Sequence, residues 1–185
     1  MPHAAVTEAA PVDRAGDDST ARFVALYREL FPPLYGFVRF RVRDAQVAED
    51  LTAQVFERAL ARLATVREPE RVRAWLFTIA RNAIIDHRRR HRPMCDLADA
   101  DALEHLWADS PESDAVRREE WRRLAIYLGD LTDRERDAIG LRFAAGLMNR
   151  EIGAVLGLSH ANVAQIIHRA VVKLRRRFDA EEMPS

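Results

Sequence analysis

Residues 131–178 restrict the fold of this chain more than any other stretch, because their pattern predicts helices joined by a tight turn. Thr132 and Glu135 have the spacing of a capping box, in which each side chain satisfies a free amide at a helix start. Gly157 stands where a turn needs a positive φ, and Ser159 can cap the helix that follows. The segment therefore predicts a helix-turn-helix, with Gly146 ending its first helix.

The last predicted helix of this segment has one apolar stripe and one polar face. The stripe recurs at i, i+4, i+7 and i+11 and consists of Val163, Ile167, Ala170 and Leu174. The residues that point elsewhere include His160, Ala161, Gln165, His168 and Arg169. Such a face is typical of a helix that reads DNA, and Ile166 on it indicates either extra core or an apolar contact.

Formal charge is zero overall but is segregated along the chain. By segment it is −3 for residues 1–20, +7 for 21–92, −7 for 93–116, +6 for 117–178 and −3 for 179–185. Two basic blocks separated by an acidic one favour two domains that each approach a polyanion. The alternative is that charged residues scatter over solvated faces.

Composition excludes several other classes of protein. A chain of 185 residues with 48% hydrophobic content can bury one sizeable core or two small ones. Cys95 is the only cysteine, which leaves no internal disulfide and no CxxC-type zinc site. No run approaches the roughly 20 apolar residues that a membrane span needs, and the first 20 residues lack the pattern of a secretory signal. We therefore expect a cytoplasmic protein without membrane insertion.

Three helices are predicted in the first basic block, after a disordered tail in residues 1–20. The first begins near Ala21, and Pro32 with Pro33 must kink or restart it. Asp44 can cap the second, whose apolar stripe is Val47, Leu51, Val55 and Ala59 with Phe56 beside it. Pro69 lies near the start of the third, which ends in a basic cluster at residues 81–92. That cluster favours phosphate contact over a merely solvated face.

No strand alternation competes with these patterns, so the predicted fold is all-α, with two small helical domains. Residues 93–116 are rich in Asp, Glu and Ala and indicate an acidic linker. Residues 117–129 predict an amphipathic helix that covers the hairpin, and residues 179–185 form a C-terminal tail.

In this order, the parts resemble an extracytoplasmic-function sigma factor of the sigma-70 family across residues 21–178. Region 2 is similar to residues 21–92, where VAEDLTAQVFERAL occupies the place of the polymerase-binding helix and AWLFTIARNAIIDHRRR that of the helix that melts and reads the minus-ten element. Region 4 is similar to residues 117–178, where LSHANVAQIIHRAVVKLR matches the helix that recognises the minus-35 element.

The resemblance implies three sets of functional residues. Those that face core polymerase are Asp50, Leu51, Gln54 and Phe56. Those at the minus-ten element are Trp75, Arg81, Asn82, Asp86, Arg88 and Arg89. Those at the minus-35 element are Arg142, Arg150, His160, Asn162, Gln165, Arg169 and Lys173. Trp75 is equally consistent with a core residue, and Asp86 with pairing to Asn82 or to an Arg.

Two stretches depart from the family pattern. Ala53 and Gln54 stand where the family usually has Gln and Glu. In the recognition helix, Asn162, Ala164, Gln165 and Ile166 stand where Thr, Lys, Ser and Arg are usual, so two cations are absent. Asn and Gln can bond adenine and Arg can bond guanine, so base reading remains available with less electrostatic attraction.

The expected function is promoter recognition and DNA opening together with bacterial core RNA polymerase, through its β and β′ subunits. Promoter DNA is the second partner, and the resemblance further implies a cognate anti-sigma protein that covers the polymerase-binding faces. No cofactor and no catalytic group are expected.

Two other classes of protein fit fewer of these features. A free-standing helix-turn-helix regulator would need only the second block. A metal enzyme could be drawn from His87 and His91, but no third ligand stands at a useful spacing and the surrounding Arg charge repels a cation.

Overall fold

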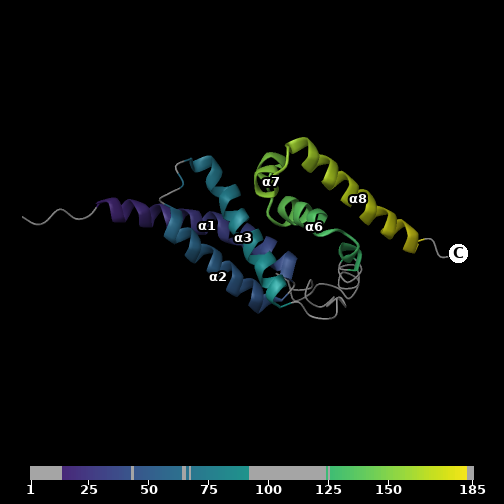
Figure 1. Cartoon of the computed structure of the whole chain (residues 1–185), viewed down its shortest axis with the longest axis horizontal. Coiled ribbons are helices and arrows are strands. Elements are labelled where there is room, and N and C mark those ends of the chain that lie inside the picture. Colours follow the sequence, from purple (N-terminus) through teal and green to yellow (C-terminus); the bar gives the residue numbers. More distant parts are fainter. Residues whose placement is uncertain are drawn as a thin grey trace, which may run out of the picture.

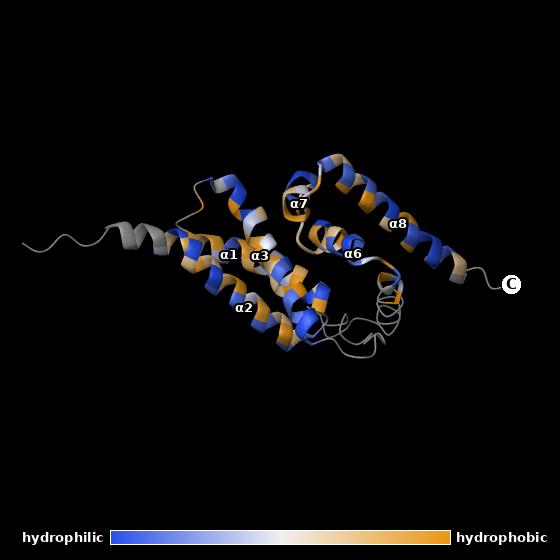
Figure 2. Cartoon of the chain, viewed as in Figure 1, coloured by the Kyte–Doolittle hydropathy of each residue, from blue (hydrophilic) through white to orange (hydrophobic). Residues whose placement is uncertain are grey.

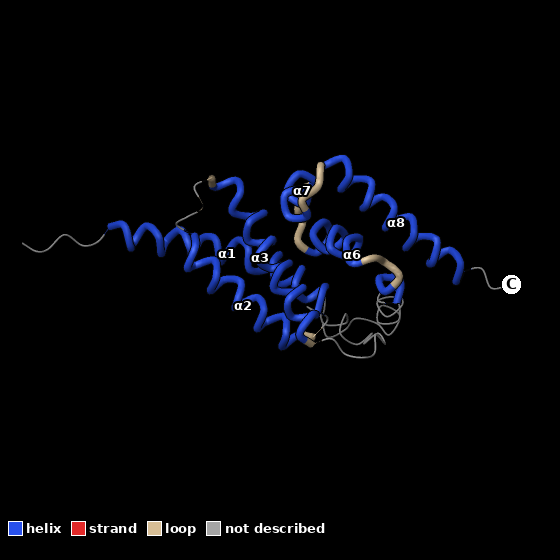
Figure 3. The backbone as a smooth tube through the Cα atoms, in the orientation of Figure 1, coloured by secondary structure: helices blue, strands red, loops and turns tan. Residues whose placement is uncertain are grey.

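The computed structural model describes residues 14–42, 44–63, 66, 68–91, 124 and 126–182, and the regular elements in these ranges are all helices (Figure 3). The all-α prediction is therefore confirmed for the described part. Predictions for residues 1–13, for the linker at 93–116 and for the tail at 183–185 lie outside it.

Three helices make up the N-terminal bundle: α1 (Arg14–Val42), α2 (Ala45–Arg62) and α3 (Pro69–Arg90). They pack side by side in Figure 1, with the start of α1 extending beyond the other two. The expected disorder up to residue 20 is wrong for residues 14–20, because α1 already begins at Arg14 and not near Ala21. It also continues through Pro32 and Pro33 without a restart.

The C-terminal unit, residues 126–182, contains α6 (Asp133–Ile139), η2 (Gly140–Ala144), α7 (Asn149–Leu156) and α8 (His160–Glu182). A helical stretch at residues 126–129 precedes α6. The π-helical turn η2 continues α6, and Gly146 ends it with a φ of 66°. In Figure 1, α6 lies between α3 and α8.

The helix starts follow the capping residues that the sequence indicates. The Asp44 carboxylate accepts a hydrogen bond from the Val47 amide at 2.8 Å, and Pro69 occupies the first turn of α3. Thr132 and Glu135 form the predicted capping box. Local chemistry therefore sets these boundaries, since each cap satisfies an amide that the helix itself leaves unpaired.

One apolar core runs through both parts of the described chain. Leu34, Phe37 and Phe77 of the N-terminal bundle belong to the same buried cluster as Leu141 and Ile152 of the C-terminal unit. Apolar residues, orange in Figure 2, lie mainly where the helices face one another. Burial of apolar surface therefore holds the two parts together as well as each part by itself.

Two glycines let α1 and η2 approach closely. A Cβ on Gly140 would lie 2.6 Å from Cδ1 of Phe40, and one on Gly36 would lie 3.2 Å from the carbonyl oxygen of Ala144. Gly140 has φ −61° and ψ −44°, which any residue can adopt. Its lack of a side chain is therefore a packing requirement between the two parts.

Arginines of the N-terminal bundle also pair with acids of the C-terminal unit. Asp137 lies 2.8 Å from Nε of Arg41 and accepts a hydrogen bond from Nε of Arg81 at 2.7 Å. The Arg41 contact is an ion pair whose N–H is not aligned for a hydrogen bond. Asp133 accepts hydrogen bonds from Arg41, at 3.1 Å, and from Arg88. The Arg41 and Asp137 side chains are each 3% exposed, so this pair belongs to the interior.

The turn between α7 and α8 depends on a close backbone approach. Gly157 has a φ of 67°, as expected, and a Cβ on Gly153 would lie 2.6 Å from the carbonyl oxygen of Leu158. That oxygen is backbone and cannot move aside as a side chain would. No side chain therefore fits at residue 153 without shifting the turn.

We predict that Gly153→Ala destabilises the protein by about 1–3 kcal/mol, as overpacking of a tight contact generally does. Urea unfolding followed by circular dichroism measures the free energy of unfolding. Gly129→Ala is the matched control, since a Cβ there meets nothing within 4 Å. Equal stability of Gly153→Ala and the unsubstituted protein would contradict this account of the turn.

We also predict that Asp133 contributes to the stability of the fold in a way that is lost in acid. Its partial burial opposes ionisation, but hydrogen bonds from Arg88 and Arg41 outweigh that and lower its pKa from 3.8 to about 2. Since the folded state binds this proton more weakly, Asp133 stabilises the fold above about pH 4, and the contribution is lost as pH falls to about 2.

The measurement is the melting temperature as a function of pH for the unsubstituted protein and for Asp133→Asn. The two curves should converge as pH falls from about 4 to about 2. Parallel curves over that window would show that Asp133 does not contribute in this way.

Candidate nucleic-acid interface

The polar face of α8 is the first candidate surface for nucleic acid. His160, Asn162, Gln165 and Arg169 are exposed, while Val163 and Ala170 are buried and hold the helix against α6 and α7. Ser159 caps the helix by accepting a hydrogen bond from the Asn162 amide at 3.3 Å. The polar and basic side chains that sequence predicted on this helix therefore reach solvent.

The position of Ile166 decides between the two interpretations that the sequence allows for it, a core residue or an apolar contact. It is only 9% exposed, so it is part of the core of the C-terminal unit and not an apolar contact for a base or a protein. Together with Val163 and Ala170 it widens the buried stripe of α8. Ala164 and Gln165 stay outside the core.

The remaining basic residues proposed around α8 differ in how free their charges are. Lys173 donates two hydrogen bonds to Glu135, at 2.7 and 2.9 Å. Partial burial opposes ionisation of Glu135, but the bonds from Lys173 and Thr132 outweigh it and lower the Glu135 pKa. Arg142 donates to the carbonyl of Leu147 at 3.2 Å. Lys173 is thus neutralised within the unit.

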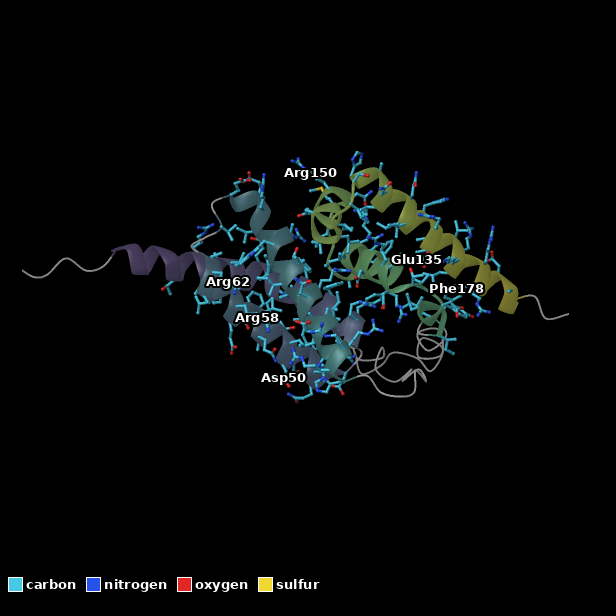
Figure 4. The ribbon with its side chains drawn as sticks, in the orientation of Figure 1. Asp50, Arg58, Arg62, Glu135, Arg150 and Phe178 are labelled. Carbon is cyan, nitrogen blue, oxygen red and sulfur yellow. The ribbon has the colours of Figure 1, made fainter. Side chains whose placement is uncertain are left out.

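Arg150 lies exposed on α7, and Figure 4 shows its side chain at the upper edge of the C-terminal unit. Arg169 donates to the carbonyl of Gln165 at 3.3 Å, within α8 itself. Both guanidinium groups keep further donors for an outside ligand.

The basic end of α3 is the second candidate surface. Asn82 is exposed, Trp75 is half-buried against the core, and Asp86 pairs with Arg89 at 3.4 Å. The Asp86 side chain therefore pairs with an Arg, which was one of the alternatives, and Trp75 has a structural role in the described state. Arg81 and Arg88 point toward α6, where Asp137 and Asp133 hold them.

His87 and His91 stack, with ring centroids 4.3 Å apart. Burial lowers the pKa of His87, and the neighbouring His91 and Arg90 lower it further. Among the described residues, no group of three or more His, Cys, Asp or Glu side chains has the arrangement of a metal site. No described helix is long and apolar enough to cross a membrane.

The outer face of α2 is the candidate surface for a protein partner. Asp50 and Gln54 are exposed on it, and Figure 4 shows Asp50, Arg58 and Arg62 along α2 on the side away from the C-terminal unit. Leu51 and Phe56 were expected to face a partner too, but they are 5% and 4% exposed. In the described state, the apolar stripe of α2 carries both side chains into the core.

The sequence pattern did not indicate a functional role for the four residues that link the two parts most directly. These are Arg41, Arg73, Asp133 and Asp137. Arg73 donates to the carbonyl of Ala145 at 3.0 Å. One signal was available: Arg41 follows Phe37 at i+4 on a buried stripe, so a charge there needs a buried partner. The pattern did not indicate which acid supplies it.

Comparisons with known proteins agree on one family. Residues 26–93 match the family model of Sigma-70 region 2, and residues 127–176 match that of Sigma-70 region 4. The chain is 29% identical over 154 residues to the ECF RNA polymerase sigma factor SigM of Bacillus subtilis, covering 83% of this chain and 93% of SigM. It is 30% identical over 169 residues to the ECF RNA polymerase sigma factor SigL of Mycobacterium tuberculosis, covering 90% of this chain and 94% of SigL.

A solved structure supports the same assignment. CnrH, in its complex with the cytosolic domain of CnrY, superposes with a TM-score of 0.66 at 27% identity, covering 90% of this chain and 94% of CnrH. Sequence, both region models and three-dimensional arrangement therefore coincide over nearly the whole chain. The chain belongs to the extracytoplasmic-function RNA polymerase sigma factors of the sigma-70 family.

Proposed function

We propose that this sigma factor binds core RNA polymerase through the outer face of α2, reads the minus-ten element through α3 and reads the minus-35 element through α8. The observation that carries the proposal is the presence of both sigma regions, in order, on one chain that aligns with SigL over 94% of its length. The domain limits proposed are 21–92 for the first region and 117–178 for the second. A free-standing regulator would leave the first region without a role.

The exposed side chains of α8 suit the reading of base edges. An amide such as Asn162 or Gln165 can form two hydrogen bonds with adenine, and Arg169 can do so with guanine. A helix presented on the outer side of its unit can enter a major groove, as second helices of this motif do. Because Lys173 is paired with Glu135, we assign it a weaker phosphate contact than Arg150.

The end of α3 suits an unpaired strand. Asn82 offers an exposed amide for the Watson–Crick edge of a base, and Arg89, two helical turns further along α3, is 79% exposed for a phosphate. Trp75 supports this surface from beneath by packing on the core. The chain needs no catalytic group for this role, since RNA synthesis belongs to the polymerase.

Asp50 and Gln54 are the α2 side chains that we assign to core polymerase, at its β and β′ subunits. Leu51 and Phe56 would instead keep α2 in place. We further propose a regulatory protein partner of the anti-sigma type, because CnrH was solved in a complex with the cytosolic domain of CnrY. Since polymerase lies in the cytoplasm, we propose that location for this chain.

Transcription with purified core polymerase tests the proposal as a whole. With core polymerase from the source bacterium and its fragmented genomic DNA, the sigma factor should direct RNA synthesis from a defined set of start sites. Core polymerase alone is the control. Absence of binding to core polymerase, with correct folding shown by circular dichroism, would refute the proposal.

Gln165→Ala and Arg169→Ala should each weaken recognition of the minus-35 element, by ~1–3 kcal/mol for a lost bidentate base contact. Once start sites are mapped, binding of a labelled upstream duplex measures this loss. Arg58→Ala is the control, because it removes the same charge from exposed α2, far from α8. Core binding should be unchanged in the α8 variants, and its loss there would mean that the interfaces are misassigned.

Asp50→Ala should lower affinity for core polymerase about 3- to 30-fold, as expected for an interface contact worth about 1–2 kcal/mol. Competition with a labelled sigma factor for core polymerase measures the change. Asp179→Asn, which removes an exposed acid from α8, is the control. If both variants bind core polymerase as tightly as the unsubstituted protein, the α2 assignment is wrong.

A further inference from the structure

The ion pairs described between the two parts share one polarity. The N-terminal bundle supplies the cations and the C-terminal unit supplies the anions. The pairs are Arg41 and Arg81 with Asp137, Arg41 and Arg88 with Asp133, and Arg73 with Glu151. Guanidinium groups bind carboxylates and phosphates through the same parallel N–H donors. The arginines of α1 and α3 are thus occupied by groups that resemble a nucleic-acid backbone in charge and geometry.

Two of these arginines are among those assigned to the minus-ten element. Nε of Arg81 lies 2.7 Å from Oδ2 of Asp137, and Arg88 donates to Asp133. Arg41, which no family pattern placed at DNA, completes the row because it contacts both acids. In the described state, these arginines therefore have carboxylates where a phosphate would have to bind.

We propose that Asp133 and Asp137 of α6 stand in for DNA phosphates, so that the closed arrangement of the two parts and the binding of single-stranded DNA along Arg41, Arg81 and Arg88 exclude each other. This inference rests on the proposed function, since it takes the α3 surface to be a DNA surface. It adds Arg41 to that surface and makes the closed chain a self-inhibited form.

The contact between the two parts becomes less exposed to solvent from its edge to its interior. The Asp133 side chain is 62% exposed and Arg88 is 38% exposed, whereas Arg41 and Asp137 are each 3% exposed. A DNA strand can therefore replace Asp133 at Arg88 first, while replacement of Asp137 requires the two parts to separate. Separation also exposes apolar surface around Phe37 and Leu141, which opposes it.

The outer face of α2 takes no part in this closure. Asp50 and Gln54 are exposed in the closed chain, so polymerase has access to them before the parts separate. Binding of polymerase can accordingly precede opening, and the free chain is kept from binding DNA on its own. The exchange of carboxylate for phosphate keeps each arginine paired, which limits the electrostatic cost of opening.

Two variants of the full chain distinguish the effect of the acidic charge on DNA binding from the effect of the closed arrangement. Asp133→Asn removes the exposed acid at the edge and leaves the core intact. Gly140→Leu changes no charge but places a side chain against the Phe40 ring, where a Cβ alone would lie 2.6 Å from Cδ1. Asp179→Asn is the control for the loss of one negative charge from the same unit.

Fluorescence anisotropy with a short labelled oligothymidine strand, at one fixed salt concentration, measures DNA affinity. Double electron–electron resonance spectroscopy measures the distance between α2 and α8. The spin labels are attached at Ala53→Cys and Ala164→Cys, in a chain that also carries Cys95→Ser. Asp133→Asn and Gly140→Leu should each bind the strand ~3- to 10-fold more tightly than the unsubstituted and Asp179→Asn proteins. Saturating the unsubstituted chain with the strand should lengthen the label distance.

The inference is overturned if Gly140→Leu lengthens the label distance without tighter DNA binding, or if DNA binds at full occupancy with the distance unchanged. It is also overturned if Asp133→Asn binds no better than Asp179→Asn. Should Gly140→Leu fail to fold, Asp133→Asn and the DNA-induced distance change still decide the question. A failure of promoter-directed transcription by the unsubstituted protein with core polymerase would instead refute the proposed function, because these measurements contain no polymerase.

Discussion

A buried carboxylate shared by two helices organises the described structure. Asp137 of α6 lies between Arg41 of α1 and Arg81 of α3, and its side chain is almost fully buried. An ion pair in the interior adds little net stability, because both groups lose their hydration, but removal of one partner leaves an uncompensated charge. The value of this arrangement lies in orientation: one relative position of the two sigma regions satisfies Asp137, Arg41 and Arg81 together.

Packing follows from that orientation. Gly36 and Gly140 bring α1 and η2 close, and the apolar residues on either side of them merge into one core. Of the two arrangements that composition allows, one sizeable core or two small ones, the described chain has one large cluster shared by both parts and a smaller one within the C-terminal unit. The π-helical turn η2 carries Gly140 at this crossing, and such turns are frequent at functional sites. The opening that we propose would have to break this contact between α1 and η2.

The proposed interfaces differ in how closure affects them. The polar face of α8 and the outer face of α2 are exposed in the closed chain, so duplex DNA and polymerase have access to them. The basic end of α3 is divided: Asn82 and Arg89 reach solvent, while Arg81 and Arg88 are bound to α6. The closed chain therefore offers only part of this proposed surface to a DNA strand.

The sequence by itself determined the local structure, because caps and periodicity act within a few residues. Asp44, Pro69, the Thr132 and Glu135 box, and Gly157 each predicted an element boundary that the structure contains. The helical periodicity likewise predicted the polar face of α8, and the paired motifs predicted the family. The structure adds local detail to these expectations: residues 14–20 extend α1, and Leu51 and Phe56 face the core in the described state.

Only the tertiary structure decided which charges are free. Arg41 and Asp137 are 96 positions apart in the sequence, and no pattern within one helix indicates that they are in contact. The same holds for Lys173 with Glu135, and for Arg81 and Arg88 with the acids of α6. Composition shows that cations and anions are available, but a pair forms only where packing brings two helices together and excludes water. For this reason Arg81 and Arg88, which were expected to contact DNA, instead pair with acids of α6 in the described state.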